Sequence, residues 1–178
     1  MSAIHRQIER LGTVADRLSD AAAALALVLL VAMIAVTLSE VVQRHFLNAP
    51  TIWAYDVSYM LNGSVFMLGA AFTLRREGHV RIDFLLRLFP PAFRDAMQAV
   101  FYLGLFVPAL GLATYFAVGQ AIRAVERGEL QSASAWEPVI WPFLTGLALG
   151  MGLLLLQTLA DGLRHAARSR AALRRPRT

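Results

Sequence analysis

Four stretches of the chain contain no charged residue, and they constrain the fold more than any other feature of the sequence. Each is between 18 and 27 residues long, and they cover positions 21–39, 57–74, 96–122 and 138–160. A helix that crosses the hydrocarbon core of a bilayer needs about 20 residues. None of the four alternates polar and apolar residues as a strand of a membrane barrel would. The pattern predicts an all-α integral membrane protein with four transmembrane helices.

The composition agrees with this class of protein. Hydrophobic residues make up 57% of the chain, charged residues only 16%, and the mean hydropathy is +0.54. A soluble domain carries more polar surface than this. The chain has no cysteine, so disulfides and metal sites with thiolate ligands are excluded. The first apolar run is longer than the core of a secretory leader and is followed by "SEVVQRHF", so we expect it to be retained as a helix.

The distribution of arginine predicts the orientation of the four helices. All 17 basic residues are arginines, and 14 of them fall in the two tails and the connection between the second and third helices. The other side of the membrane receives only Arg44, Arg123 and Arg127. Because basic loops stay on the cytoplasmic side, both termini are predicted in the cytoplasm. The basic C-terminal tail is typical of attraction to anionic lipid rather than of nucleic-acid binding.

The chain divides into three parts by composition. Residues 1–20 place apolar side chains at helical spacing and predict an amphipathic cytoplasmic helix on the inner leaflet. Residues 21–160 form the four-helix membrane domain, and 161–178 form a basic cytoplasmic tail. Residues 80–89 predict a second interfacial helix, with His79, Asp83 and Arg87 along one ridge.

Several local features bear on helix packing. Glu40 and Arg44 are four residues apart near the outer end of the first helix, where they can pair. Pro108 predicts a kink within the third helix. Gly146 and Gly150 form a GxxxG motif in the fourth, which favours close helix packing.

No catalytic or cofactor motif is evident, which indicates a protein that is not an enzyme. The four histidines fall in predicted tails and loops, whereas a haem-binding bundle needs histidines facing each other within it. A transporter acting alone would need an ionisable group at mid-membrane depth, and Glu40 and Asp56 fall at helix ends. A partner-dependent membrane subunit fits these observations best. A membrane anchor for a redox enzyme and an oligomeric drug exporter remain as alternatives.

Three segments carry a resemblance to a known family. They read "RHFLNAPTIWAYD", "LGAAFTLRREGHVRIDFLLRLFPP" and "SASAWEPVIWPF", and together with the four helices they resemble the small permease subunit, of the DctQ type, of tripartite ATP-independent periplasmic (TRAP) transporters. The chain departs from the family pattern at Asp56, where Glu is commoner, and at His45, where Tyr is commoner. The residues that match are Arg44, Asn48, Trp53, Asp56, Gly69, Arg75, Gly78, His79 and Asp83.

The resemblance implies a division of labour between chains. A separate large permease would hold the substrate and sodium sites, and a periplasmic binding protein would deliver an organic acid. This chain would be a scaffold that binds no cofactor and no substrate, packed in membrane lipid against the large permease. His79 and Asp83 would either hold that partner or tie together the connection in which they lie.

Overall fold

The computed structural model describes residues 3–76 and 91–173, and within them the fold is built from long helices. The first hairpin consists of α1 (Ala3–Phe46) and α2 (Ala54–Arg75). The second consists of α4 (Pro91–Val100), the π-helix η1 (Phe101–Phe106) and α5 (Val107–Arg127), which run on from one another, followed by α6 (Trp141–Leu173). Four helical stretches of the described residues are long and apolar enough to cross a membrane, which confirms the all-α class with four spans.

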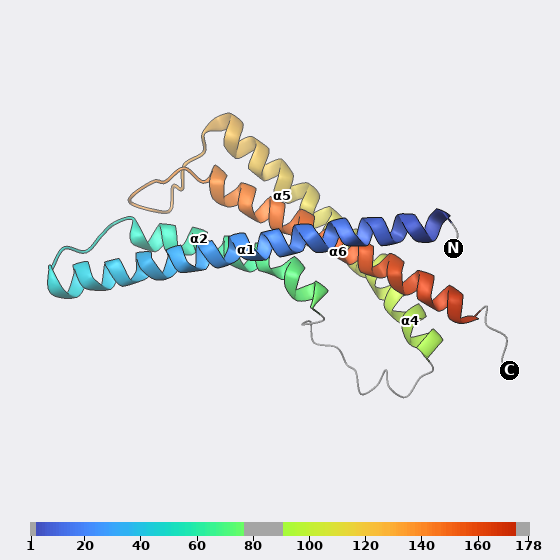
Figure 1. Ribbon diagram of the computed structural model, residues 1–178. Helices are drawn as coiled ribbons and strands as arrows, with labels where there is room; N and C mark the ends of the chain where they lie inside the picture. The colour runs from blue at the N-terminus through green and yellow to red at the C-terminus, as the bar shows by residue number, and fades with distance from the viewer. Residues whose placement is uncertain (1–2, 77–90, 174–178) are drawn as a thin grey trace.

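The two ends of the bundle differ in what they hold. Both termini lie at one end, and the α1–α2 and α5–α6 connections lie at the other (Figure 1). We call these the inner end and the outer end, after the orientation predicted from arginine. α1 alone contains 44 residues, which at 1.5 Å per residue is about 66 Å, well beyond a hydrocarbon core of about 30 Å. Part of α1 therefore extends past the bilayer.

The amphipathic N-terminal segment is part of this long helix. α1 begins at Ala3 and continues through position 21 without a break. Ala15 is buried, and Asp16 bonds to residues of α6. One face of this N-terminal segment therefore packs against α6 and is not in contact with lipid or water alone.

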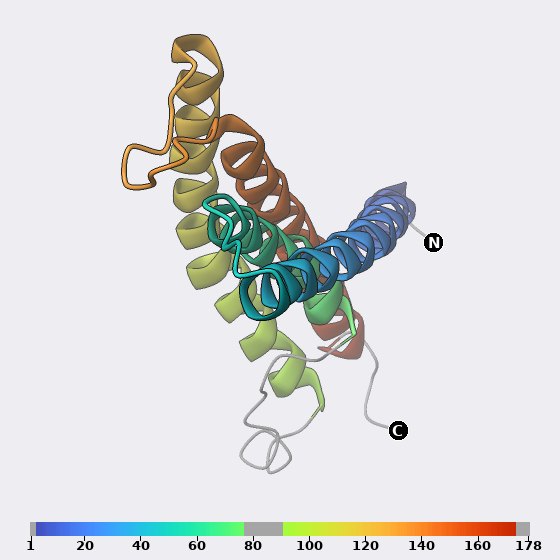
Figure 2. The same ribbon diagram turned by 90° about the vertical axis from the view of Figure 1, so that its left-hand side faces the viewer.

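α6 is the central helix of the bundle. It packs against α1, α2, α4, η1 and α5, and Figure 2 shows it between α5 and the α1–α2 hairpin. The buried side chains are mostly small, which lets helix backbones approach closely in a membrane protein. They include Ala22, Ala26, Ala71, Ala124 and Ala160. Large apolar side chains such as Leu27, Val28 and Val31 point outward instead, as suits a lipid-facing surface.

The third span changes its hydrogen-bonding pattern just before Pro108. The six residues Phe101–Phe106 form a π-helix, and α5 begins at the next residue with Pro108 in its first turn. Proline has no N–H to donate, and its ring clashes with the carbonyl four residues earlier. A π-turn is one way for a helix to accommodate this disruption. The π-helix thus lies directly before Pro108, and the kink predicted there stays a prediction.

Candidate functional sites at the two ends of the bundle

Arg44 and Asn48 order the turn that follows α1 at the outer end. Arg44 Nη2 lies 2.7 Å from Glu40 Oε1, so the pair predicted from their spacing forms. The other oxygen of Glu40 accepts a bond from the Thr51 backbone N–H at 3.1 Å, and the Thr51 hydroxyl donates to it as well. Asn48 has a φ of 49°, in the left-handed region that Asn tolerates better than most residues. Glu40 therefore joins the end of α1 to the start of the connection.

Trp53 and Asp56 lie at the beginning of α2. Trp53 occupies the N-cap position, and its carbonyl accepts the bond from Val57 N–H at 3.1 Å. Asp56 is 8% exposed and accepts a hydrogen bond from the Ser134 hydroxyl, in the loop between α5 and α6. The Ser134 oxygen in turn accepts the Trp136 backbone N–H at 3.1 Å. Asp56 thus fixes the second outer loop to α2.

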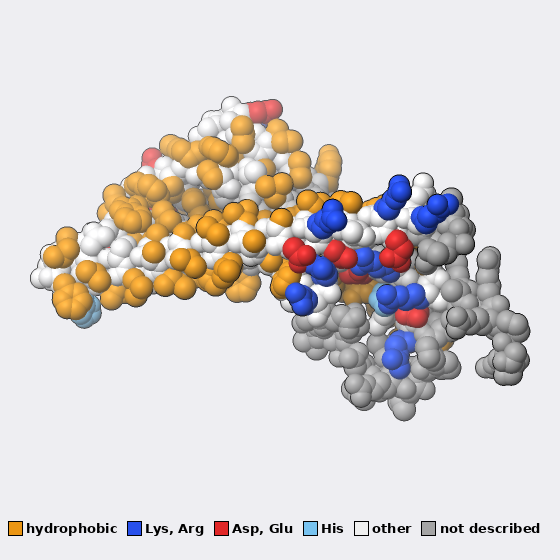
Figure 3. Space-filling model, viewed as in Figure 1, with side chains coloured by type: hydrophobic (Ala, Val, Ile, Leu, Met, Phe, Trp, Pro, Cys, Tyr) orange, Lys and Arg blue, Asp and Glu red, His pale blue; other side chains and the backbone are white. Residues whose placement is uncertain are grey.

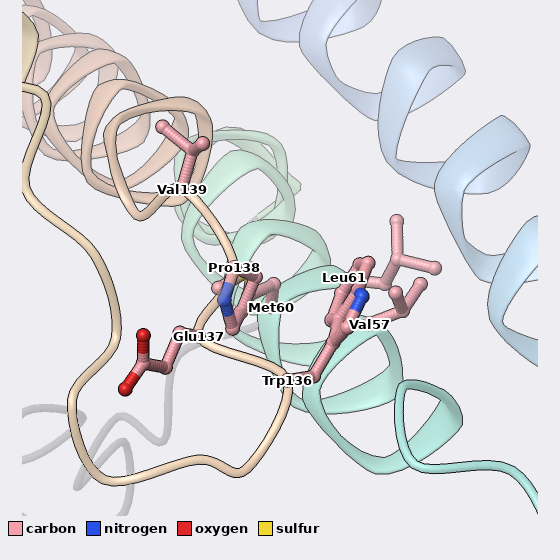
Figure 4. A pocket seen from close by; sticks show the side chains of 7 residues that line it. All are labelled: Val57, Met60, Leu61, Trp136, Glu137, Pro138 and Val139. Atoms are coloured by element: carbon pink, nitrogen blue, oxygen red, sulfur yellow. The ribbon is translucent and has the colours of Figure 1, made fainter.

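That loop has a defined shape. Gly128 ends α5 with a φ of 60°, and Leu130 and Val139 form an isolated antiparallel bridge. Glu137 also has a positive φ, of 47°. The loop and α2 line an open apolar cavity of about 550 Å³, where Trp136 lies beside Val57 and Leu61 (Figure 4).

The middle of the bundle is closed by direct contact between α2 and α6. A Cβ atom on Gly150 would lie 2.6 Å from the Met67 carbonyl carbon, and one on Gly146 would lie 3.0 Å from Ser64 Oγ. Gly69 differs, because a Cβ there would meet nothing within 4 Å. Gly146 and Gly150 of α6 thus face α2, while Gly69 of α2 faces away from its neighbours.

The inner end holds a network of hydrogen bonds that joins α1, α2 and α6. We call it the inner polar cluster, and it consists of Asp16, Ser19, Asp20, Arg75, Gln157, Asp161 and Arg164. Figure 3 shows most of the visible charged side chains gathered at this end of the molecule, while hydrophobic side chains are widespread over the rest of the visible face. Apart from Arg75, none of these residues was singled out from the sequence as a site.

Asp16 is the centre of the inner polar cluster. Arg164 Nη2 donates to Asp16 Oδ2 at 2.8 Å, and Gln157 Nε2 donates to Asp16 Oδ1 at 3.2 Å. Arg75 donates from Nη1 to the Asp16 backbone carbonyl at 3.1 Å and also pairs with Asp20. Arg75 and Arg164 therefore hold helices together, a role that their count as positive-inside residues did not predict.

Gln157 brings the cluster into the packed interior. Its side chain is fully buried, and it accepts a hydrogen bond from the Ser19 hydroxyl at 3.0 Å. Its amide nitrogen also donates to Asp161 Oδ2 at 3.2 Å. A buried amide in a membrane helix needs partners of this kind, because lipid offers none. A glutamine inside an apolar run, four residues before an aspartate, was the sequence signal available for this site.

A second pair of residues joins the start of the third span to α6. His165 Nδ1 lies 2.9 Å from Asp95 Oδ1, and the imidazole stacks on Tyr102 with the ring centres 6.0 Å apart. His165 was expected in a tail, but α6 continues to Leu173 and places it on a helix. Charged residues outside the hydrocarbon core do not end a helix, so this part of the predicted tail is helical.

Three residues of the family resemblance, Gly78, His79 and Asp83, lie outside the described residues, as does the interfacial helix predicted at 80–89. Within residues 3–76 and 91–173, no group of three or more His, Cys, Asp or Glu side chains could hold a metal ion. The roles assigned to the matched residues and the division of the chain into three parts stay predictions.

Comparisons with known proteins agree on one family. Residues 33–168 match the family "Tripartite ATP-independent periplasmic transporters, DctQ component". A relative in Haemophilus influenzae (strain 86-028NP), named "Sialic acid TRAP transporter permease protein SiaT", is 30% identical over 79 residues. That match covers 44% of this chain and 13% of the relative, so the chain spans only a small part of that permease. No solved structure matches.

Proposed function

We propose a scaffolding role from one premise, which is that this chain belongs to the DctQ component family of TRAP transporters. As a member of this family, the chain is a small membrane subunit of a transporter and not an enzyme. In our proposal the subunit holds a large permease in place, and that permease carries out sodium-coupled uptake of an organic acid. A periplasmic binding protein delivers the acid. The proposed membrane is the bacterial inner membrane, with both termini in the cytoplasm.

One observation carries the scaffolding proposal: the centre of the bundle is filled by helix-to-helix contact. Gly150 approaches the backbone of Met67, and α6 packs on every other described helix. Two cavities of the described residues, one beside Trp136 and one beside Arg168, lie at the outer and inner ends. A carrier moves solute past a site near the bilayer midplane, formed by broken helices or ionisable groups. A bundle closed there suits a subunit that supports a carrier.

The matched relative supports a large permease as the partner. The aligned segment is 13% of that protein, so a region similar to this chain is joined there to a much longer polypeptide named as a permease. In that relative the region similar to this chain and the rest of the permease share one polypeptide. This supports the binding of this chain to a separate permease chain. We place the sodium and substrate sites in that partner and propose no cofactor for this chain.

Reconstitution tests the proposal. The large permease is purified with and without this chain and placed in proteoliposomes, and uptake of sialic acid and succinate is followed with the binding protein outside. We expect a stable complex and uptake that requires both membrane chains and an inward sodium gradient. Equal uptake without this chain would overturn the scaffolding role. Uptake unchanged when potassium replaces sodium would overturn the coupling.

The redox-anchor alternative has its own test. An absorption spectrum of the purified chain, reduced with dithionite, would show a haem band if this chain held haem between its helices. We expect no such band.

A further inference from the structure

The outward side of α2 carries one narrow band of exposed residues. At 100° per residue, the members of this band fall within about 80° of one another around the helix. Five are exposed, and the glycine among them has open space above it. We call this band the α2 stripe, and its members are Tyr55, Tyr59, Asn62, Phe66, Gly69 and Thr73. The opposite side of α2 is buried against α1 and α6.

Asn62 is the unusual member of the α2 stripe. It lies eight residues after Ala54 and thirteen before Arg75, which places it about 12 Å and about 20 Å from those ends of the span. Among the described residues it has no hydrogen-bond partner. Its amide can donate two hydrogen bonds and accept others, and lipid tails can satisfy none of them.

Three threonine side chains of the spans are satisfied within their own helix. The hydroxyls of Thr37, Thr73 and Thr145 each donate to the carbonyl four residues earlier, at 2.8–2.9 Å. Gln120 of α5 is exposed as well, but it lies one turn before Arg123, near the outer end of its span. Asn62 is therefore the exposed amide that lies deepest in a span among the described residues.

The rest of the α2 stripe suits contact with another helix. A Cβ on Gly69 would meet nothing within 4 Å, so a second helix could approach the backbone there. Phe66 is 68% exposed and Tyr59 is 52% exposed, one on each side of Asn62 along the helix. Aromatic side chains add contact area with few rotatable bonds, while asparagine adds a hydrogen bond between membrane helices.

We propose that the α2 stripe is the surface on which a transmembrane helix of the large permease packs, with the Asn62 amide hydrogen-bonded to that helix. This inference rests on the proposed function. A lipid chain could cover the aromatic side chains but could not bond the amide. A second copy of this chain could do so, but in the matched relative a region similar to 79 residues of this chain belongs to a longer polypeptide that is named as a permease.

Site-directed photo-crosslinking tests the surface directly. A benzophenone amino acid replaces Tyr59 or Phe66 in the full chain, co-expressed with the tagged large permease, and membranes are irradiated. The matched control replaces Tyr115 on α5, which is 73% exposed and lies outside the stripe. We expect adducts with the permease from positions 59 and 66 and none from 115. Adducts from 115 alone, or dimers of this chain from 59 and 66, would overturn the proposal.

Substitution of Asn62 tests the hydrogen bond. We expect Asn62→Leu to lower the amount of permease that co-purifies by about three- to tenfold, while Gln120→Leu leaves it unchanged. An equal yield for Asn62→Leu, or a loss confined to Gln120→Leu, would contradict the assignment. Failure of the unsubstituted chain to bind the permease would instead overturn the proposed function, so the two failures can be told apart.

Discussion

Arg164 and Asp16 form an ion pair, with 2.8 Å between Nη2 and Oδ2, that ties the last membrane helix to the first across 148 positions of sequence. Their side chains are 19% and 23% exposed. A pair that is mostly shielded from water and supported by further hydrogen bonds is stronger than an ion pair on an open surface. The fold therefore depends on charges at its inner end as well as on apolar packing.

Removing one partner of this pair should destabilise the protein. We expect Asp16→Asn to lower the free energy of unfolding by about 1.5–3 kcal/mol, because Arg164 loses one of its two charged acceptors and keeps only Asp161. The measurement is thermal unfolding in detergent micelles. The control is Arg17→Gln, which changes an exposed neighbouring residue and should have an effect within about 0.5 kcal/mol. Asp16→Asn as mild as Arg17→Gln would contradict this account of the cluster.

Gly150 should tolerate no side chain. In Gly150→Ala the new methyl group would lie 2.6–2.7 Å from Met67 atoms, two of which are backbone atoms, so α2 and α6 would have to separate. We expect a loss of about 1–3 kcal/mol, as for other overpacked positions. Gly152→Ala is the matched control, since nothing lies within 4 Å of its added Cβ. Both variants can be compared by the fraction that remains monodisperse after heating. Equal behaviour would show that α2 and α6 do not meet at Gly150.

Ser134 should hold the second outer loop in place. Ser134→Ala removes a hydrogen bond to the buried carboxylate of Asp56, and such bonds to charged groups contribute about 1.5–3 kcal/mol. In a background with Trp53 and Trp141 replaced by Phe, we expect stronger acrylamide quenching of Trp136 fluorescence. Ser132→Ala, at an exposed position of the same loop, should leave quenching unchanged. Quenching that is the same in both variants would place Trp136 outside the influence of this bond.

The orientation can be read from single cysteines, because the chain has none of its own. We expect Ser132→Cys to react with a membrane-impermeant maleimide in cells whose outer membrane has been permeabilised. Arg17→Cys should react only after the inner membrane is opened as well. Both positions are exposed, so access from one side of the membrane decides the result. The reverse pattern would invert the topology inferred from arginine.

The spans themselves could be predicted from the sequence, because absence of charge over about 20 residues is a local property. Positions 21–39, 57–74 and 96–122 each fall within one of the stretches that the structure makes long and apolar enough to cross a membrane, and 138–160 overlaps the fourth, which begins at Trp141. Helix ends were harder to place. α1 and α6 extend well past their apolar runs, since charged residues remain good helix formers in water.

The inner polar cluster could not be predicted in the same way. Its bonds join residues 138, 141 and 148 positions apart, and no local pattern pairs Ser19 with Gln157 or Asp16 with Arg164. The distribution of arginine predicted on which side of the membrane Arg75 and Arg164 lie, but not which residues they bond to. Gln157, a polar amide within an apolar run, needs a partner that lipid cannot supply, but its position alone does not say which residue meets it.

The paired charges at the two ends also set a length. From Asp20 to Glu40 along α1 is 20 residues, and from Asp56 to Arg75 along α2 is 19 residues, or about 30 Å and about 28 Å. These lengths match the thickness of a typical hydrocarbon core, about 30 Å. The charged residues at each end of the bundle are held by bonds to other segments of the chain. Their separation along the helices is therefore fixed and cannot adjust to a different membrane. The bundle thus has a fixed hydrophobic length. A thinner or thicker membrane would create a hydrophobic mismatch, and either the membrane would deform around the bundle or the bundle would tilt.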